Sequence, residues 1–332
     1  MRVDDIRPEE LVKENYRLYV KDVEWLMEHK AEFRLVGCPC CGRALEDGAL
    51  VPEFVKDGFA HRRCAACGTV YISPRPTREM LLDYYKNAES IRHWGKCLHP
   101  ATEDYRRSRI DLPRAAAVSA DCLEYGIPRG TLVDLGAGFG TFAELARRHF
   151  FHRVVAVEPS PPLAEGCRAR GLEVIEATAE ELHIDGANVV TAFELIEHLF
   201  DPRDLVDAVK RALVPCGLLI LTTPDVEGFD LATLGALSDN VGGPNHLQFF
   251  TAAGMRVLLE GAGFEVLEVT TPGKLDAELV RAKALSGELD LSHQPFLREV
   301  LVDRWDDLGA PFQRFLEDNG LSSHMRVVAL RR

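Results

Sequence analysis

One stretch constrains the fold of this chain more than any other, the run TLVDLGAGFGTF from Thr131 to Phe142. Apolar residues lead into an acid, Asp134, and three glycines follow at alternate positions, Gly136, Gly138 and Gly140. The residues after them have helical spacing. A strand, a glycine-rich turn and a helix in this order form the unit with which parallel α/β sheets bind nucleotide-like ligands. Glycine lets the backbone turn tightly and lets a ligand lie against it.

The spacing of the glycines separates two classes of cofactor. A dinucleotide fingerprint, G-x-G-x-x-G, requires a third glycine where this chain has Thr141. The observed pattern, acid-x-G-x-G-x-G, instead resembles the first motif of class I S-adenosylmethionine (SAM)-dependent methyltransferases. In that family the amino and carboxylate groups of SAM lie over the turn, and the acid accepts from the ammonium. The candidate cofactor-binding residues of this turn are Asp134, Gly136, Ala137, Gly138 and Gly140.

A second acid strengthens this interpretation. The apolar run Val154–Val157 predicts a buried strand, and it ends in Glu158-Pro159, about 20 residues after the glycine turn, where a ribose-diol acceptor is expected. A glycine-rich turn alone also occurs in ordinary strand–helix connections. The turn and Glu158 together favour a methyltransferase over other α/β nucleotide folds.

Composition limits the remaining classes. The chain has 332 residues, of which 46% are hydrophobic and 27% charged, as in a globular protein with one large domain and additions, or with two domains. No apolar run is long enough to span a membrane, and the N-terminus lacks an apolar signal core, so we expect a cytoplasmic protein. A net charge of −13 weighs against a nucleic-acid partner. The oligomeric state stays open.

Two cysteine knuckles, Cys38-Pro-Cys-Cys-Gly42 and Cys64-Ala-Ala-Cys-Gly68, predict a zinc ribbon with short strands at 50–55 and 59–63. Disulfides are the alternative, but no secretion signal supports them. Cys40 points elsewhere or substitutes as a ligand. Four thiolates fill the coordination sphere, so the zinc should be structural. The predicted ligands are Cys38, Cys41, Cys64 and Cys67. The other four cysteines, expected to be small buried residues, are Cys97, Cys122, Cys167 and Cys216.

Strands and helices alternate from Gly130 onward, which predicts a doubly wound, seven-stranded α/β sheet with the ligand at the carboxyl ends of its strands. The expected strands are 132–135, 154–158, 172–177, 187–193, 217–223, 264–270 and 324–329. The expected segments are a helical arm (1–36), the zinc ribbon (37–76), a helical linker or lid (77–126), the SAM-binding core (127–273), and a helical insertion with the last strand (274–332).

Three segments around the expected strand ends carry candidate catalytic groups. The run from Phe193 to His198 closes the fourth strand, Thr-Thr-Pro224 closes the fifth, and His246 precedes the next helix. If the first segment is helical, its two glutamates and its histidine share one face. They could supply a general base or bind a divalent cation, or they could only anchor the loop. The candidate catalytic residues are Glu194, Glu197, His198 and His246.

These motifs together resemble the ubiquinone-type branch of class I methyltransferases, over about Gly130 to Pro272. The ribbon, from Gly37 to Pro76, resembles bacterial relatives that often modify glycans or secondary metabolites. The four catalytic candidates also resemble the metal-binding set of small-RNA 2′-O-methyltransferases. One departure concerns adenine, where the family often has Asp-Ala and this chain has Thr178-Ala179. The further cofactor-binding candidates are Thr178, Ala179 and Phe193.

The sequence therefore predicts a SAM-dependent methyltransferase that acts on a small molecule, most simply at a hydroxyl of a sugar or secondary metabolite. His198 is the first candidate for the base and His246 the second. Three alternatives stay open: a sugar C-methyltransferase with a histidine base, a metal-dependent RNA 2′-O-methyltransferase, and a non-catalytic SAM-binding protein. A helix predicted from Thr102 to Tyr125 carries Arg106, Arg107 and Arg109, which could reach a substrate or the SAM carboxylate, or face solvent.

Overall fold

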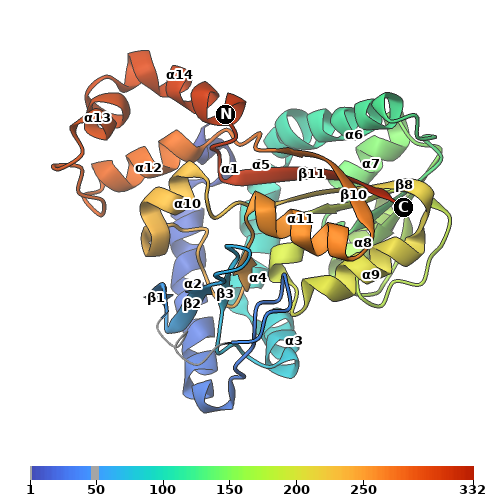
Figure 1. Cartoon of the computed structure of the whole chain (residues 1–332), viewed down its shortest axis with the longest axis horizontal. Coiled ribbons are helices and arrows are strands. Elements are labelled where there is room, and N and C mark those ends of the chain that lie inside the picture. The colour runs from blue at the N-terminus through green and yellow to red at the C-terminus, as the bar shows by residue number, and fades with distance from the viewer. Residues whose placement is uncertain (1, 46–51) are drawn as a thin grey trace. The chain divides into compact units, whose positions relative to one another are not determined.

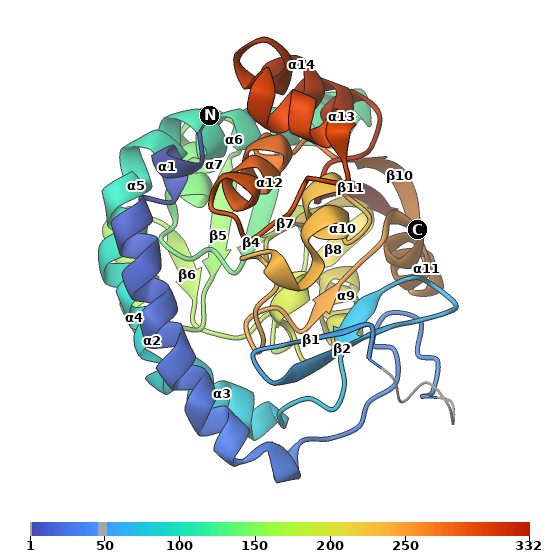
Figure 2. The same ribbon diagram turned by 90° about the vertical axis from the view of Figure 1, so that its left-hand side faces the viewer.

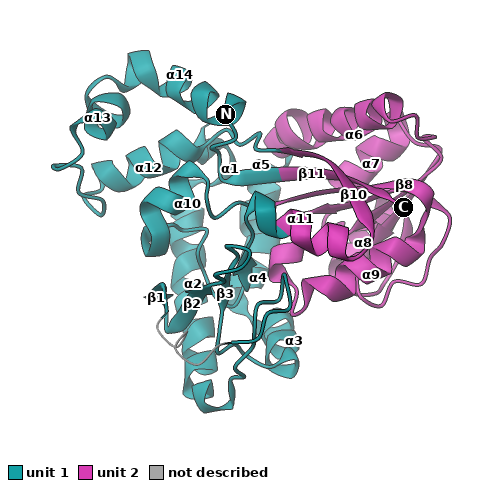
Figure 3. Cartoon of the chain, in the orientation of Figure 1, with its two compact units in different colours: residues 1–103, 224–254, 270–325 teal, residues 104–223, 255–269, 326–332 magenta. Residues whose placement is uncertain are grey.

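The computed structural model describes residues 2–45 and 52–332 (Figure 1). The chain divides into two compact units (Figure 3). Unit 1 comprises Met1–Glu103, Pro224–Gly254 and Thr270–Met325; unit 2 comprises Asp104–Thr223, Met255–Val269 and Arg326–Arg332. Unit 1 thus unites the expected arm, the ribbon and most of the insertion. The five segments expected from the sequence stay a prediction.

A seven-stranded sheet forms unit 2, in the order β10-β11-β8-β7-β4-β5-β6. This confirms the predicted doubly wound α/β fold. β4 pairs in parallel with β5 on one side and with β7 on the other, so Leu135 lies level with Val157 and Ala192. The strands are β4 (Thr131–Leu135), β5 (Arg153–Val157), β6 (Glu173–Ile175), β7 (Ala187–Phe193), β8 (Leu213–Pro224), β10 (Phe264–Thr270) and β11 (His324–Arg331).

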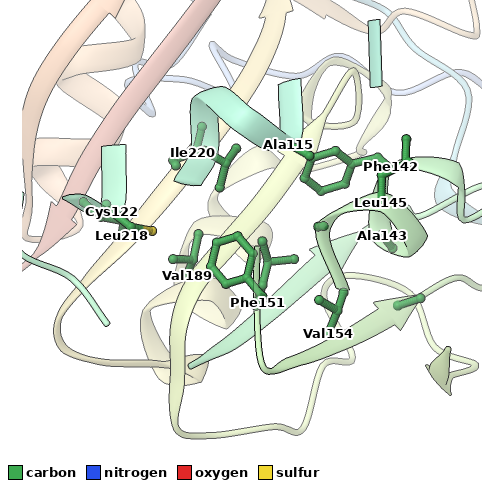
Figure 4. Packing of buried hydrophobic residues seen from close by; sticks show 14 of the residues in the cluster. Ala115, Cys122, Phe142, Ala143, Leu145, Phe151, Val154, Val189, Leu218 and Ile220 are labelled. Atoms are coloured by element: carbon green, nitrogen blue, oxygen red, sulfur yellow. The ribbon is translucent and has the colours of Figure 1, made fainter. Parts of the chain in front are cut away.

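The core of unit 2 lies between this sheet and two of its helices (Figure 4). Ala115 and Cys122 of one helix and Phe142 and Leu145 of the next pack on strand residues such as Leu218. These strands read as continuous apolar runs because both faces of a parallel sheet are covered. The helices of the unit are η3 (Arg107–Asp111), α6 (Leu112–Glu124), α7 (Thr141–His149), α8 (Pro161–Ala169), η4 (Ile196–His198), α9 (Pro202–Ala212) and α11 (Ala252–Gly261).

Two strands differ from expectation. β6 ends at Ile175, two residues before the predicted end. β8 begins at Leu213, not at residue 217, because its pairing with β7 contains a bulge between Ala187 and Val189. Cys216 lies in the extra residues with a φ of 61° and is exposed, as is Cys97, so the expected burial of these two cysteines is wrong.

Unit 1 contains a four-stranded sheet in the order β1-β2-β3-β9. Its first three strands are β1 (Phe54–Lys56), β2 (Phe59–Arg63) and β3 (Val70–Ile72), and they belong to the ribbon. The fourth, β9 (Gln248–Phe249), comes from a distant part of the sequence and was not predicted. Residues 50 and 51 of the first expected ribbon strand lie outside the described residues.

Helices make up the rest of unit 1. α2 packs against the segment that begins at α4, and Asp22 accepts from the backbone N–H groups of Glu89 and Ser90 there. The predicted insertion is helical, and its helix α12 lies beside α10 (Figure 2). Buried residues of the insertion, such as Val280 and Leu316, form a cluster with Leu234 of α10. The helices are α1 (Val3–Ile6), α2 (Glu9–Glu28), η1 (Lys30–Glu32), α3 (Arg78–Asn87), α4 (Glu89–His93), η2 (Trp94–Leu98), α5 (His99–Arg106), α10 (Phe229–Leu234), η5 (Gly235–Leu237), α12 (Asp276–Leu285), α13 (Pro295–Arg298), η6 (Glu299–Asp303) and α14 (Trp305–Asp318). Within the described residues, none of the helices has the length and apolarity that crossing a membrane requires.

Candidate functional site

The three glycines of the turn between β4 and α7 all have left-handed backbone conformations, with φ of 67°, 55° and 74°. Each has different surroundings. A Cβ on Gly140 would lie 2.8 Å from the Cys167 sulfur, and one on Gly136 would lie 3.1 Å from Leu195. A Cβ on Gly138 would meet nothing closer than the carbonyl oxygen of Gly136, at 4.0 Å. Packing therefore explains two of the glycines, and only Gly138 borders open space of the kind a ligand needs.

Two buried carboxylates lie beside this turn. Asp134, on β4, accepts a hydrogen bond of 2.7 Å from the Thr191 hydroxyl, and burial raises its pKa to about 7. Glu158, directly after β5, accepts from the backbone N–H groups of Gly138 and Ser160, both at 2.9 Å, and burial raises its pKa. The structure thus places both predicted acids at adjacent strand ends, and Glu158 holds the glycine turn in shape.

An arginine that the sequence reasoning missed also lies here. The guanidinium of Arg114, on α6, lies 4.4 Å from the ring centre of Phe193, and its charge favours the ionised form of Asp134. Arg107, which the sequence offered as a possible partner of the SAM carboxylate, instead pairs with Glu144 at 2.9 Å. Arg114 follows Arg107 by seven residues, about two helical turns, and this spacing was the available signal.

Three residues are candidates for binding adenine: Thr178 and Ala179 follow β6, and Phe193 ends β7. The Thr178 hydroxyl donates to the Glu181 carboxylate at 3.1 Å, and Ala179 is buried. Phe193, at the end of β7, meets Phe142 edge-on at 4.8 Å between ring centres. A role for these residues in binding adenine stays a prediction.

The segment after β7 does not form the helical face that the spacing of its glutamates allowed. Glu194 has a φ of 51°, and only Ile196–His198 make a 3-10 turn. Each glutamate instead accepts from a hydroxyl of β8: Glu194 from Thr222 at 2.6 Å, and Glu197 from Thr223 at 2.9 Å. The Glu-x-x-Glu-His and Thr-Thr-Pro motifs therefore bind each other.

Burial governs the chemistry of this segment. Glu197 is fully buried, and burial, together with the nearby charge of Glu194, raises the pKa of its carboxyl well above the usual range. His198 is partly exposed, with Nε2 3.9 Å from Oε1 of Glu197. These are the properties of a loop anchor. Of the three side chains only Glu197 is buried, whereas Glu194 is exposed and His198 is partly exposed.

His246 belongs to unit 1, so the four catalytic candidates are divided between the units and their grouping stays a prediction. Its Nδ1 lies 2.6 Å from the Asn240 carbonyl oxygen, and its ring meets Phe249 edge-on at 5.7 Å. Because a carbonyl can only accept, Nδ1 carries a proton, and in the neutral imidazole Nε2 is then the basic nitrogen.

The four predicted zinc ligands come together in unit 1, with all their sulfur atoms within 4.8 Å of one another. The sulfurs of Cys38 and Cys67 are 3.5 Å apart, and those of Cys41 and Cys64 are 3.6 Å apart. Thiolates around zinc at about 2.3 Å in a tetrahedron are separated by roughly 3.8 Å, so this set fits the ion. Cys40 is not a member of this set, and its sulfur donates to the Gly254 carbonyl at 3.0 Å.

Comparisons with known proteins indicate the family to which the chain belongs. A family model described as a methyltransferase domain matches residues 105–269. The "Probable S-adenosylmethionine-dependent methyltransferase" of Mycolicibacterium smegmatis is 31% identical over 221 residues, which are 62% of this chain and 77% of that protein. The "Ubiquinone biosynthesis O-methyltransferase" of Xanthomonas oryzae is 30% identical over 152 residues, 42% of this chain and 56% of that protein.

Among solved structures, a SAM-dependent methyltransferase from Clostridium acetobutylicum matches with a TM-score of 0.46 and 12% identity, over 71% of this chain and 99% of that chain. The chain spans just over half the length of the ubiquinone biosynthesis enzyme but about three quarters of the Mycolicibacterium relative. On the strength of that relative and of the matched domain, the chain belongs to the SAM-dependent methyltransferases, enzymes that use SAM as their methyl donor.

Proposed function

We propose that this enzyme binds SAM over the glycine turn of unit 2 and transfers its methyl group to a hydroxyl of a small molecule, a sugar or a secondary metabolite. The observation that supports this most is the open space at Gly138 beside the buried acids Asp134 and Glu158. The name of the Xanthomonas relative, an O-methyltransferase, supports a hydroxyl acceptor. The net charge of −13 argues against RNA.

Each group of SAM has a candidate partner in unit 2. Asp134 accepts from the ammonium, Glu158 from the ribose hydroxyls, and Arg114 pairs with the carboxylate, as its guanidinium already favours negative charge beside Asp134. Glu158 keeps lone pairs for the ribose although it already accepts two backbone N–H groups. The adenine lies against Phe193 and the segment of Thr178 and Ala179.

SAM binding is expected to weaken as the pH falls. Burial raises the pKa of Asp134 to about 7, so below that pH the free enzyme holds a proton there that must leave when the ammonium binds. Affinity should therefore be constant well above pH 7 and decrease by up to about tenfold per pH unit below it. Calorimetry of SAM binding between pH 5.5 and 8.5 measures this slope. Asp134→Asn should bind more weakly with a flat profile, and an equal slope in both proteins would contradict the assignment.

The transfer is an in-line displacement at the sulfonium methyl, in which the enzyme aligns the acceptor and a base removes its proton. Either His246 through Nε2 or His198 could be that base. The bonds from Thr222 and Thr223 to the two glutamates, and the raised pKa of Glu197, favour a metal-free base over a bound cation. A cation, if bound, would instead lower the pKa of the acceptor hydroxyl.

The test uses isotope-labelled SAM with acceptor panels of sugar nucleotides, phenols and catechols. On the acceptor that is methylated, replacing the true base by alanine, in His246→Ala or His198→Ala, should lower kcat by roughly 10²- to 10⁴-fold without changing SAM affinity. His152→Ala, an exposed histidine of unit 2, is the matched control. In the first minutes after its addition, before a structural zinc ion is lost, chelator should silence a cation-dependent enzyme and leave an enzyme with a free base active. Full activity in a protein carrying both His198→Ala and His246→Ala would contradict both the histidine base and the bound cation.

We also infer that the four clustered thiolates hold a structural zinc ion. The four sulfurs leave no position for substrate, so this ion takes no direct part in the transfer.

A further inference from the structure

We propose that the zinc ribbon positions the segment that carries His246, so that zinc loading governs methyl transfer but not SAM binding. We call residues Gly242 to Gly254 the His246 segment. This inference rests on the proposed function, in which His246 is one of two candidate bases and the four thiolates hold a zinc ion. All the contacts below lie within unit 1.

The backbone of the His246 segment is part of the ribbon sheet. β9 pairs with β3, with Val70 opposite Phe249 and Tyr71 opposite Gln248. The register continues toward the histidine, because the N–H of Ile72 donates to the Leu247 carbonyl at 2.9 Å. Leu247, the residue directly after His246, therefore accepts a hydrogen bond from the ribbon.

The C-terminal half of the segment is bound to the cysteine knuckles themselves. The buried Thr251 hydroxyl donates to the Cys67 carbonyl at 2.8 Å and accepts from the N–H of Gly254 at 2.9 Å. The Cys40 sulfur donates to the Gly254 carbonyl at 3.0 Å. Each knuckle thus holds this half of the segment through one residue. Cys67 is itself a predicted zinc ligand, and Cys40 is the neighbour of one, Cys41.

The N-terminal half packs closely on ribbon side chains. A Cβ on Gly243 would lie 2.7 Å from both Ile72 and Phe59, so only glycine fits there. The Tyr19 hydroxyl donates to the Gly243 carbonyl at 2.7 Å. The ribbon thereby contacts the segment before His246 as well as after it.

These contacts determine the direction of the imidazole. His246 is oriented by the Asn240 carbonyl and by the edge of Phe249, and Phe249 is itself a residue of β9. Two residues of strand have no stability without a partner, and a ribbon of three short strands depends on its metal for folding. Loss of zinc should therefore release β9, Phe249 and the imidazole together. No zinc ligand lies in unit 2, where the proposed SAM-binding residues are, so SAM affinity should be unchanged.

The experiment compares full-length protein as purified, protein stripped with chelator, and stripped protein reloaded with zinc. Hydrogen exchange of the peptide spanning 245–251 should accelerate at least about tenfold on stripping and recover on reloading. Calorimetric SAM affinity should change less than about threefold, and turnover should fall in parallel with the loss of protection. Unchanged exchange at 245–251 in protein whose ribbon strands have lost protection would overturn the proposal, as would full turnover in the stripped protein.

A variant that keeps its zinc tests separately whether the cysteine knuckle holds the His246 segment in place. Thr251→Val removes the hydroxyl that bonds the Cys67 carbonyl and the Gly254 N–H but changes no zinc ligand. Zinc content should therefore stay at the wild-type level, while exchange at 245–251 accelerates about two- to tenfold. Thr102→Val is the control, because the Thr102 hydroxyl donates to nearby carbonyls, those of Leu98 and His99, and it should leave this peptide unchanged. Equal protection of the peptide in Thr251→Val and wild type would overturn the coupling. Full activity of His246→Ala, with the exchange effect intact, would overturn only the base assignment of the proposed function.

Discussion

Gly138→Val is expected to abolish SAM binding while unit 2 stays folded. The valine side chain would occupy the open space at the turn, since no atom other than the Gly136 carbonyl oxygen, at 4.0 Å, borders the position of its Cβ. The left-handed backbone at this residue, with φ of 55°, adds strain of about 1–2 kcal/mol. Circular dichroism should show an intact fold with a slightly lower Tm. Addition of SAM should raise the Tm of wild type and not that of the variant.

The matched control is Gly126→Val. Gly126 also lies in unit 2 with a left-handed φ of 69°, and a Cβ there meets no atom within 4 Å. It carries the same backbone strain as Gly138 but borders no candidate site residue. The control should therefore lose similar stability and keep its response to SAM. Equal responses to SAM in the two variants would show that SAM binds elsewhere.

Zinc should be present at about one ion per chain, and the double variant Cys38→Ser with Cys64→Ser should lose it. Structural zinc contributes roughly 10–16 kcal/mol in isolated zinc-finger peptides, so the ribbon should lose its fold without the ion. Elemental analysis measures the ion, and hydrogen exchange of β1 to β3 measures the fold. Affinity for SAM should persist, since the candidate residues for SAM lie in unit 2.

The control for this variant replaces the exposed pair, Cys97→Ser with Cys216→Ser. It changes the same number of thiols but none in the cluster, so zinc content and ribbon protection should stay at wild-type levels. Absence of zinc from protein purified without chelator would refute the metal assignment. So would an undisturbed ribbon in the Cys38 and Cys64 variant.

Much of the fold could be predicted because its signals are local. The apolar runs that end in Asp134 and Glu158 mark strands covered on both faces, and the acids mark the strand ends. β9 could not be predicted, because its two residues have no signal of their own and form a strand only by pairing with β3, more than 170 residues away. The bulge in β8 escaped prediction for the same reason, since it depends on pairing with β7.

In the site, too, the residues with a local sequence signal could be predicted and those that depend on distant contacts could not. Residues whose position follows from a strand end or a knuckle, such as Asp134, Glu158 and Cys38, lie where the spacing placed them. The spacing of Glu194 and Glu197 suggested a shared helical face, but the left-handed backbone of Glu194 prevents it. Arg114 was missed because its contact with Phe193 joins a helix to a strand end almost 80 residues later, and its spacing from Arg107 does not reveal that partner.

The measurement that tests the central claim most directly is a calorimetric titration of wild type, Gly138→Val and Gly126→Val with SAM at pH 8. Above the raised pKa of Asp134 the carboxylate is ionised, so protonation does not limit binding. The proposed site predicts about one SAM per chain in wild type and in Gly126→Val, with no measurable binding in Gly138→Val. Equal affinity in all three proteins, or no binding to the wild type, would contradict a SAM site at the glycine turn.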